Sequence, residues 1–242
     1  MKLFISGYTG KMGQETEKAI EHEPDITLVG KSRRGDKLEV LLKETNPDVM
    51  VDFTHPSVVF QHIVIALQAG VVPVVGTTGL TDDHLQEIQA LSSQYNRGVI
   101  VCPNFAIGAI LMMRFASEAA KYMPRVEILE FHHDKKADAP SGTAIKTADM
   151  IYTTNGSINA HQPTEIESIS GARGGARHRI PIHSVRLPGF VASQEVIFGG
   201  VGQTLSIRHD TLSRDSFMPG VILAIRKAKQ TTGLLYGLEK LL

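Results

Sequence analysis

Short runs of valine and isoleucine alternate with longer amphipathic stretches through the first hundred residues, and this alternation constrains the fold more than any other feature. Stretches whose apolar residues recur with the period of a helix separate these runs. Pro56 is suited to the first turn of one of the predicted helices. Near-continuous apolar strands that alternate with helices are typical of a parallel sheet covered on both faces. The sequence therefore predicts an α/β fold with a doubly wound, Rossmann-type parallel sheet. We expect its strands at residues 3–6, 26–29, 49–53, 71–75 and 99–102.

The pattern changes after Asn104. A long helical stretch at 105–122 is followed by an alternating strand at 126–131. Several further strands with a period of two lie between His178 and His209. Strands with one polar face are typical of an antiparallel or mixed sheet. We therefore expect an α+β second domain.

A final helical stretch begins near Ser213 and is expected to return to the first domain. The chain would then cross between the domains near Asn104 and again near Arg214. The predicted first domain comprises residues 1–104 and 214–242, and the predicted second domain comprises residues 105–213.

The charge balance excludes several classes of partner. The chain carries 25 basic and 25 acidic side chains, so it lacks the basic excess on which nucleic-acid and membrane-surface binding depend. No apolar run reaches the roughly 18 residues needed to span a bilayer, and the N-terminus has no signal-peptide pattern. The single cysteine, Cys102, excludes an intrachain disulfide and suits a reducing compartment. We expect a cytoplasmic protein with no nucleic-acid or membrane partner.

A glycine-rich turn joins the first predicted strand to the first predicted helix. It reads G-x-x-G-x-x-G over residues 7–13, which departs from the common G-x-G-x-x-G dinucleotide pattern. A helix that starts in such a turn offers unpaired N–H groups and a positive dipole end to a pyrophosphate. The alternative is a tight strand-to-helix turn with a purely structural role. The position at the first strand–helix junction favours a nucleotide site.

The end of the second predicted strand bears on the choice of cofactor. An NAD-binding domain usually carries an acidic residue there for the ribose hydroxyls, whereas this strand ends in Ser32, Arg33 and Arg34. Two guanidinium groups suit a 2′-phosphate, and Lys11 in the glycine turn can add charge. The alternative is a solvated basic turn. The sequence favours NADPH over NADH.

Residues 130–144 contain the most distinctive chemistry. Adjacent histidines, His132 and His133, precede Lys136 and a Pro-Ser-Gly-Thr helix start. The N–H groups of Gly142 and Thr143 can hold a carboxylate, Lys136 can bind a second carboxylate or donate a proton, and histidine readily gives up a proton near neutral pH. Three alternatives remain: a metal site completed by Asp134 or Asp138, histidines that merely end a strand, and a solvated lysine turn.

The run E-x-H-H-x-x-K-x-D-A-P-S-G-T-A at 130–144 resembles the signature of the 4-hydroxy-tetrahydrodipicolinate reductase family, also called dihydrodipicolinate reductase. The resemblance extends to the glycine turn, to residues 76–79 and 103–105, and to the region around Arg214. It implies NADPH- or NADH-dependent reduction of a cyclic, unsaturated dicarboxylate on the diaminopimelate route to lysine. It also implies a homotetramer assembled through the sheet of the second domain, which would bind the substrate.

The resemblance assigns roles to individual residues. His132 corresponds to the family's proton-donor histidine and Lys136 to its proton-donating lysine, while His133, Gly142 and Thr143 correspond to substrate-binding positions. Arg33 stands where many members have the acidic ribose ligand, which weakens the case for NADH. The implied cofactor contacts are Gly7, Tyr8, Thr9, Gly10, Lys11, Met12, Arg33, Arg34, Gly76, Thr77, Thr78, Cys102, Pro103, Asn104 and Phe105.

Two rival functions use the same scaffold. One is a different oxidoreductase that acts on another small carboxylate, and the other is a dinucleotide-sensing regulatory protein without turnover. A sensor has no need for a histidine–lysine pair beside an anion-binding helix start, so the signature favours an enzyme. The remaining histidines of the first domain are assigned no role: His22, His55, His62 and His84.

Overall fold

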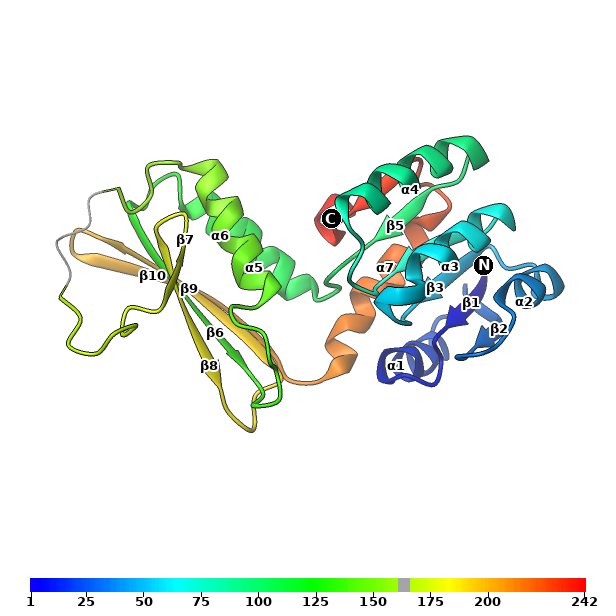
Figure 1. Cartoon of the computed structure of the whole chain (residues 1–242), viewed down its shortest axis with the longest axis horizontal. Helices are drawn as coiled ribbons and strands as arrows, with labels where there is room; N and C mark the ends of the chain where they lie inside the picture. The colour runs from blue at the N-terminus through cyan, green and yellow to red at the C-terminus, as the bar shows by residue number, and fades with distance from the viewer. Residues whose placement is uncertain (161–165) are drawn as a thin grey trace. The chain divides into compact units, whose positions relative to one another are not determined.

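A computed structural model describes residues 1–160 and 166–242. Contacts within the chain divide it into two compact units (Figure 1). Unit 1 comprises Met1–Ile107 together with Arg214–Leu242, and unit 2 comprises Gly108–Ser213. Each unit has its own sheet.

Unit 1 is built on a six-stranded sheet in the order β11-β5-β4-β3-β1-β2, in which every pairing is parallel. The prediction of a doubly wound parallel sheet is therefore confirmed. The edge strand β11 was not predicted, and it comes from the C-terminal segment and pairs with β5. The strands are β1 (Lys2–Ser6), β2 (Thr27–Ser32), β3 (Val49–Asp52), β4 (Val72–Val75), β5 (Val99–Val101) and β11 (Leu234–Tyr236).

Helices cover both faces of this sheet, with α3 and α4 on one side and α1 and α7 on the other (Figure 1). Local signals fix where two of them begin: Pro56 opens α3 after the His55 cap, and Thr81 caps α4. The short helix α2 was not predicted, although Leu38 and Leu42 give it a buried stripe. The helices are α1 (Lys11–Ile20), α2 (Leu38–Thr45), α3 (Pro56–Gln68), α4 (Asp82–Tyr95), α7 (Met218–Ala228) and the 3₁₀ turns η1 (Arg214–Phe217) and η2 (Leu238–Lys240).

Burial of the central strands explains their continuous apolar sequences. Every residue of β3 and β4 is buried, because both faces of the sheet are covered. Asp52, the last residue of β3, is the polar exception, and its side chain is fully buried.

Unit 2 contains a mixed five-stranded sheet in the order β10-β9-β6-β8-β7. The pair β6/β8 is parallel and the other pairs are antiparallel, which confirms the prediction of a mixed or antiparallel sheet. The elements are α5 (Ile107–Ala119), β6 (Arg125–His132), α6 (Gly142–Thr154), β7 (Gly175–Arg177), β8 (Ile180–Arg186), β9 (Ala192–Gly200) and β10 (Gln203–Thr211).

One face of the second sheet packs under α6. Along β6 the side chains alternate, so that Val126, Ile128 and Glu130 are buried on the same face. A carboxylate thus occupies a position where the period of two calls for an apolar residue. The opposite face carries Leu129 and Phe131, which are partly exposed.

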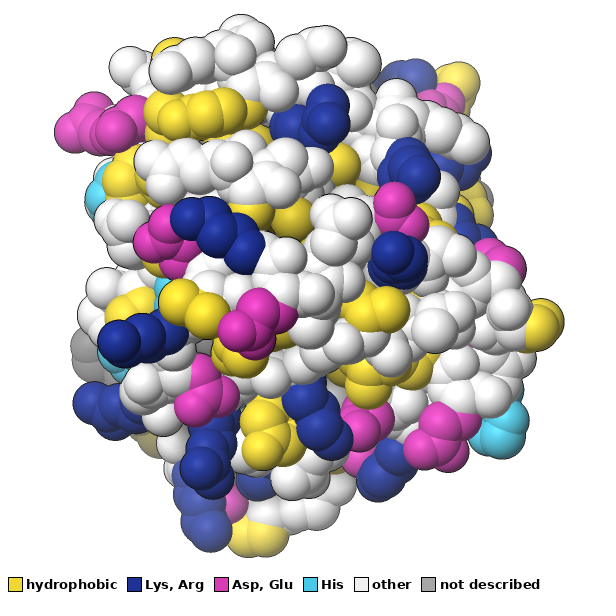
Figure 2. Space-filling view, turned by 90° about the vertical axis from the view of Figure 1, so that its right-hand side faces the viewer, with side chains coloured by type: hydrophobic (Ala, Val, Ile, Leu, Met, Phe, Trp, Pro, Cys, Tyr) yellow, Lys and Arg dark blue, Asp and Glu magenta, His cyan; other side chains and the backbone are white. Residues whose placement is uncertain are grey.

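Basic and acidic side chains are interspersed on the face drawn in Figure 2 and do not gather by sign. No helix among residues 1–160 and 166–242 is both long enough and apolar enough to cross a membrane.

Candidate active site

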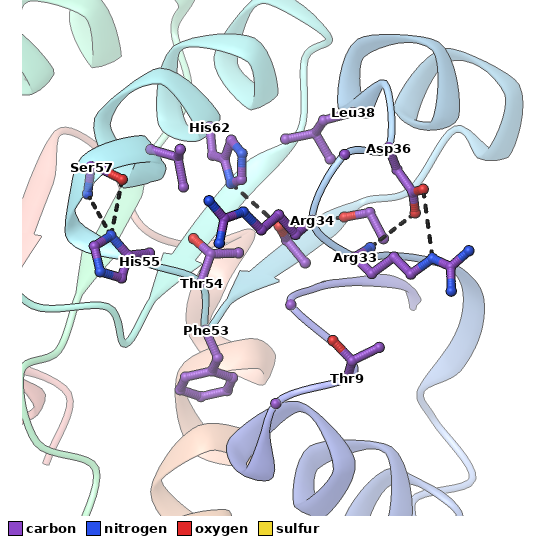
Figure 3. Close-up of a pocket in the computed structure, with 16 residues that line it drawn as sticks. Thr9, Arg33, Arg34, Asp36, Leu38, Phe53, Thr54, His55, Ser57 and His62 are labelled. Atoms are coloured by element: carbon purple, nitrogen blue, oxygen red, sulfur yellow. Dashed lines mark hydrogen bonds and ion pairs between the residues drawn. The ribbon is translucent and has the colours of Figure 1, made fainter.

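A pocket of about 480 Å³ opens at the carboxyl ends of β1, β2 and β3 (Figure 3). Its walls come from the segments that follow these strands, together with Leu38 and His62. β1 pairs with β2 on one side and with β3 on the other, so the order of successive strands reverses direction at β1. The pocket lies at this reversal. Ligands of open α/β sheets bind at this point.

The glycine turn forms the floor of this pocket in a conformation that side chains do not permit. Gly7 has a φ of +85°, and a Cβ there would lie 2.5 Å from the carbonyl oxygen of Phe53. A Cβ on Gly13 would lie 2.4 Å from the carbonyl oxygen of Gly7. Gly10 precedes α1, and no side chain caps that helix. The first N–H groups of α1 can therefore bind an anion, which fits a pyrophosphate group.

Two arginines and a carboxylate follow β2 at the pocket wall. In Figure 3 Arg34 points across the pocket toward Thr54, whereas Arg33 points the other way, beside Asp36. An Asp36 carboxylate oxygen accepts a hydrogen bond from the backbone N–H of Arg33 at 2.9 Å. The sequence interpretation found no acidic residue at the end of β2 and overlooked Asp36, whose signal is the turn Gly35-Asp36. Cationic and anionic groups therefore both line the part of the pocket where a ribose would bind.

Only part of the predicted cofactor set lines this pocket. The lining includes Gly7, Thr9, Gly10, Arg33 and Arg34 from that set. Lys11 and Met12 form the first turn of α1, and Tyr8 lies under the Lys31 ammonium group, 4.7 Å from it.

The predicted turn after β4 lies against aromatic rings. A Cβ on Gly76 would lie 2.2 Å from the ring of Phe53 and 2.9 Å from that of Phe105, so only glycine fits there. The next residue, Thr77, is buried, whereas Thr78 is exposed. After β5, Cys102 is fully buried, Pro103 is exposed, and the Asn104 side chain accepts from the N–H of Ala106 at 2.8 Å.

The sequence interpretation missed an aspartate–histidine pair at the pocket wall, in which Asp52 is buried and His62 lines the pocket. His62 Nδ1 lies 2.8 Å from the Asp52 carboxylate, which also accepts from the hydroxyls of Thr54 at 2.7 Å and Thr77 at 2.8 Å. Burial acts to raise the pKa of Asp52, but the hydrogen bonds from His62 and Thr54 outweigh it and lower the pKa below its ordinary value. The available signal was a lone carboxylate at the end of an apolar strand.

Replacing Asp52 with alanine is expected to lower the free energy of unfolding by about 2–3 kcal/mol at pH 7, because buried donors lose their acceptor. The pKa of Asp52 is depressed in the folded state. Its contribution is therefore complete above the ordinary pKa of about 4 and is lost as the pH falls through the lower folded value. Urea unfolding at pH 7 and at pH 3 measures both effects. Glu87→Ala, at an exposed position on α4, is the matched control and should change little. A wild-type value for Asp52→Ala would contradict the account.

In unit 2, His132 is the last residue of β6 and is held by buried charge. Its Nδ1 contacts a carboxylate oxygen of Glu130, which is fully buried. Arg186, on β8, donates to both oxygens of that carboxylate, at 2.7 and 3.0 Å. Burial acts to raise the pKa of Glu130, but the hydrogen bonds from His132 and Arg186 prevail and lower the pKa to about 2. Glu130 therefore stays ionised at neutral pH.

The loop after β6 carries the predicted lysine. Lys136 Nζ lies 2.7 Å from both carboxylate oxygens of Asp138. Arg186 also donates to the backbone carbonyl of Asp138, at 2.8 Å, which ties the loop to β8. His133, which follows His132 in the sequence, is exposed. Sequence reasoning missed Arg186 because the pairing of β6 with β8 is not visible in the sequence.

The start of α6 is open at the predicted carboxylate site. Ser141 caps the helix by accepting from the N–H of Ala144 at 3.2 Å. A Cβ on Gly142 would meet nothing within 4 Å, so a ligand can approach its backbone and that of Thr143. Within the described part of the chain, no group of three histidine, cysteine or acidic side chains could hold a metal ion.

Two family models match nearly the whole chain. The model described as "Dihydrodipicolinate reductase, N-terminus" matches residues 1–105, and "Dihydrodipicolinate reductase, C-terminus" matches residues 108–242.

Curated relatives are similar over their full length. The 4-hydroxy-tetrahydrodipicolinate reductase of Desulfitobacterium hafniense is 51% identical, with 100% of this chain and 98% of the relative covered. That of Syntrophomonas wolfei is 48% identical, with the same coverage. The solved structure of a dipicolinate-bound dihydrodipicolinate reductase from Paenisporosarcina sp. TG-14 has a TM-score of 0.90 and 44% identity, and covers 100% of this chain and 99% of its own.

Proposed function

The chain belongs to the dihydrodipicolinate reductase family, a family of nicotinamide-dependent oxidoreductases on the diaminopimelate route to lysine, and we propose that His132 and Lys136 supply the proton that its reaction requires. The reaction is the reduction of 4-hydroxy-tetrahydrodipicolinate to tetrahydrodipicolinate. The observation that carries the assignment is the anchoring of His132 by an ionised, buried carboxylate in the same segment as Lys136 and the open start of α6.

The substrate is a small dicarboxylate, and the segment 132–143 offers groups for both of its charges. The backbone N–H groups of Gly142 and Thr143 bind one carboxylate at the start of α6. His133 and Lys136 provide further hydrogen-bond donors for the substrate. The dipicolinate bound to the Paenisporosarcina enzyme is a dicarboxylate of this kind.

The 4-hydroxyl group of the substrate leaves as water, and a bound nicotinamide cofactor would supply a hydride to the conjugated ring that remains. Negative charge then develops on the substrate, and a protonated His132 neutralises it by giving up the proton on Nε2. Lys136 places a second positive charge beside that site and stabilises the same charge. The neutral imidazole that remains keeps the hydrogen on Nδ1, which stays hydrogen-bonded to the Glu130 carboxylate. Solvent then restores the lost proton to Nε2.

Assay of NADPH oxidation with freshly generated 4-hydroxy-tetrahydrodipicolinate tests the function. Absorbance of the reduced nicotinamide should fall with this substrate and not with a small monocarboxylate of similar size. Turnover only with the monocarboxylate would point to another oxidoreductase, and binding of NADPH without any turnover would point to a sensor.

The cofactor is proposed to be NADPH by preference, with NADH also accepted. The support is the pair of arginines after β2, since a guanidinium group binds a 2′-phosphate bidentately. Asp36, on the same wall of the pocket, is a carboxylate that can accept the ribose hydroxyls of NADH.

Replacing Arg34 with alanine is expected to raise the KM for NADPH by about 10- to 100-fold, because a charge-assisted hydrogen bond contributes about 1.5–3 kcal/mol. The KM for NADH should change by less than about threefold, since NADH carries no 2′-phosphate. Steady-state kinetics with both cofactors measures the two effects. Lys37→Ala, at an exposed position of the same segment that does not line the pocket, is the matched control. A parallel rise in both KM values would contradict the 2′-phosphate role.

We also propose a homotetramer assembled through the outer face of the second sheet. Leu129, Phe131 and Ile197 are partly exposed on the face of the sheet opposite α6. Arg208 lies 5.3 Å from the ring of Phe131 and pairs with Glu195 at 3.3 Å, so this face combines apolar and charged groups. Homodimer and tetramer interfaces are surfaces of this mixed character.

A further inference from the structure

Glu130 occupies a core position of β6 where the alternation calls for an apolar side chain. Two residues before it, Ile128 is fully buried on the same face. An unpaired carboxylate would be costly at such a depth. This one is compensated by Arg186, by His132 and by Ser184, so the protein maintains a fully buried anion at the end of one strand.

The register of the sheet places these groups together. Glu130 pairs with Ser184 and His132 pairs with Arg186 across the parallel strands β6 and β8. Because side chains two residues apart share a face, the four side chains form one cluster. Opposite His132 on β9 stands Ala192, which carries no charge.

The contact with Glu130 engages Nδ1 of the His132 ring. Among residues 1–160 and 166–242, none forms a hydrogen bond with the other ring nitrogen, Nε2. The His132 side chain is 15% exposed, so the ring has a small opening to solvent. A carboxylate that accepts from one ring nitrogen fixes the tautomer and directs the other nitrogen to the reacting group.

We propose that Glu130 is a positioning residue, which accepts the Nδ1 hydrogen of His132 and so presents Nε2 as the nitrogen that gives its proton to the substrate. Arg186 holds the Glu130 carboxylate in place and, through the carbonyl of Asp138, holds the loop that carries Lys136. This inference rests on the proposed role of His132. The ionised Glu130 does not take up the proton itself, and it stabilises the imidazolium before transfer.

Glu130→Gln tests the role because it removes the charge and keeps the shape. It should lower kcat by about 10- to 100-fold, as loss of a partner that orients a functional histidine commonly does. The KM values of substrate and cofactor should change by less than about threefold. Glu130→Asp keeps the charge and should recover part of kcat. Thermal unfolding and active-site titration give the fraction of folded enzyme, by which every kcat is divided.

The pH profile separates positioning from a structural role. The charged groups linked to His132 are Glu130 on its own strand and Arg186 on β8, which holds Glu130. Arg186 also donates to the carbonyl of Asp138 in the following loop, where Asp138 pairs with Lys136. The alkaline limb of kcat/KM should move to lower pH in Glu130→Gln, because a neutral neighbour favours the imidazolium less. An unmoved limb, with a loss of kcat that disappears after correction for folded enzyme, would overturn the proposal.

A double-mutant cycle gives a second, independent test. In the His132→Gln background, Glu130→Gln should lower kcat by less than about threefold, since Glu130 acts through His132. Equal losses in both backgrounds would overturn the proposal. Retention of wild-type kcat by His132→Gln alone would instead reject the proposed function of His132. The ¹⁵N shifts of the His132 ring should also show hydrogen on Nδ1 in the wild type, and hydrogen on Nε2 alone in the neutral ring would overturn the proposal.

Discussion

Substitution of His132 by glutamine should lower kcat by about 10²–10⁴-fold, which is the usual contribution of a positioned general acid. The amide keeps most of the volume and a hydrogen-bonding group, but it has no proton to give at neutral pH. The substrate KM should rise only a fewfold, because the proposed carboxylate ligands at the start of α6 are unchanged. Steady-state kinetics with saturating NADPH measures both constants.

The neighbouring histidine is the control for this experiment. His133 is exposed and is proposed to bind substrate, so His133→Gln should act mainly on the substrate KM. The two variants then differ in which constant changes. Equal effects of His132→Gln on kcat and KM, or no effect on either, would reject the proton-donor role.

Gly13→Ala, which adds a single methyl group, is expected to raise the Kd of the cofactor by about 10- to 100-fold. A Cβ there would lie 2.4 Å from the carbonyl oxygen of Gly7 and 2.6 Å from the Cα of Tyr8, and both are backbone atoms that cannot turn aside. Forcing extra volume into such a site costs about 1–3 kcal/mol, and each 1.4 kcal/mol is about tenfold in affinity. The turn would open, and the N–H groups of α1 would no longer converge on the pyrophosphate.

Two other glycines calibrate the effect. Gly10→Ala adds a methyl group 3.3 Å from the same carbonyl oxygen, so its effect should be smaller. Gly175→Ala adds one in β7 with no atom within 4 Å, so it should leave binding unchanged. Titration of NADPH fluorescence with each variant gives the three Kd values. Wild-type affinity for Gly13→Ala would show that the tight turn is not needed for cofactor binding.

Local patterns were sufficient to predict the parallel sheet. The central strands β3, β4 and β5 are continuous or nearly continuous apolar runs because both faces are covered, and such runs are visible in the sequence. The edge strand β11 was missed because its three residues, Leu234–Tyr236, form a strand only by pairing with β5. Propensity within a segment of that length carries little information.

In the candidate site, too, local patterns were predictable and contacts between distant segments were not. The signature at 130–144 contains both proposed proton donors, His132 and Lys136, because these residues are close in the chain. Arg186 was missed because its role depends on the register between β6 and β8, which no local pattern specifies. His62 was assigned no role because its partner, Asp52, is ten residues away on another element. Long-range pairing, which the sequence does not display, sets both contacts.

The discontinuity of unit 1 has a consequence for biosynthesis. β11 pairs with β5 only after the ribosome has added all of unit 2 and α7. Proteins are made from the N-terminus at about 5–20 residues per second, so the nascent sheet of unit 1 waits with an uncovered edge at β5 while the intervening polypeptide emerges. A ribosome that stalls within unit 2 therefore leaves an incomplete first unit.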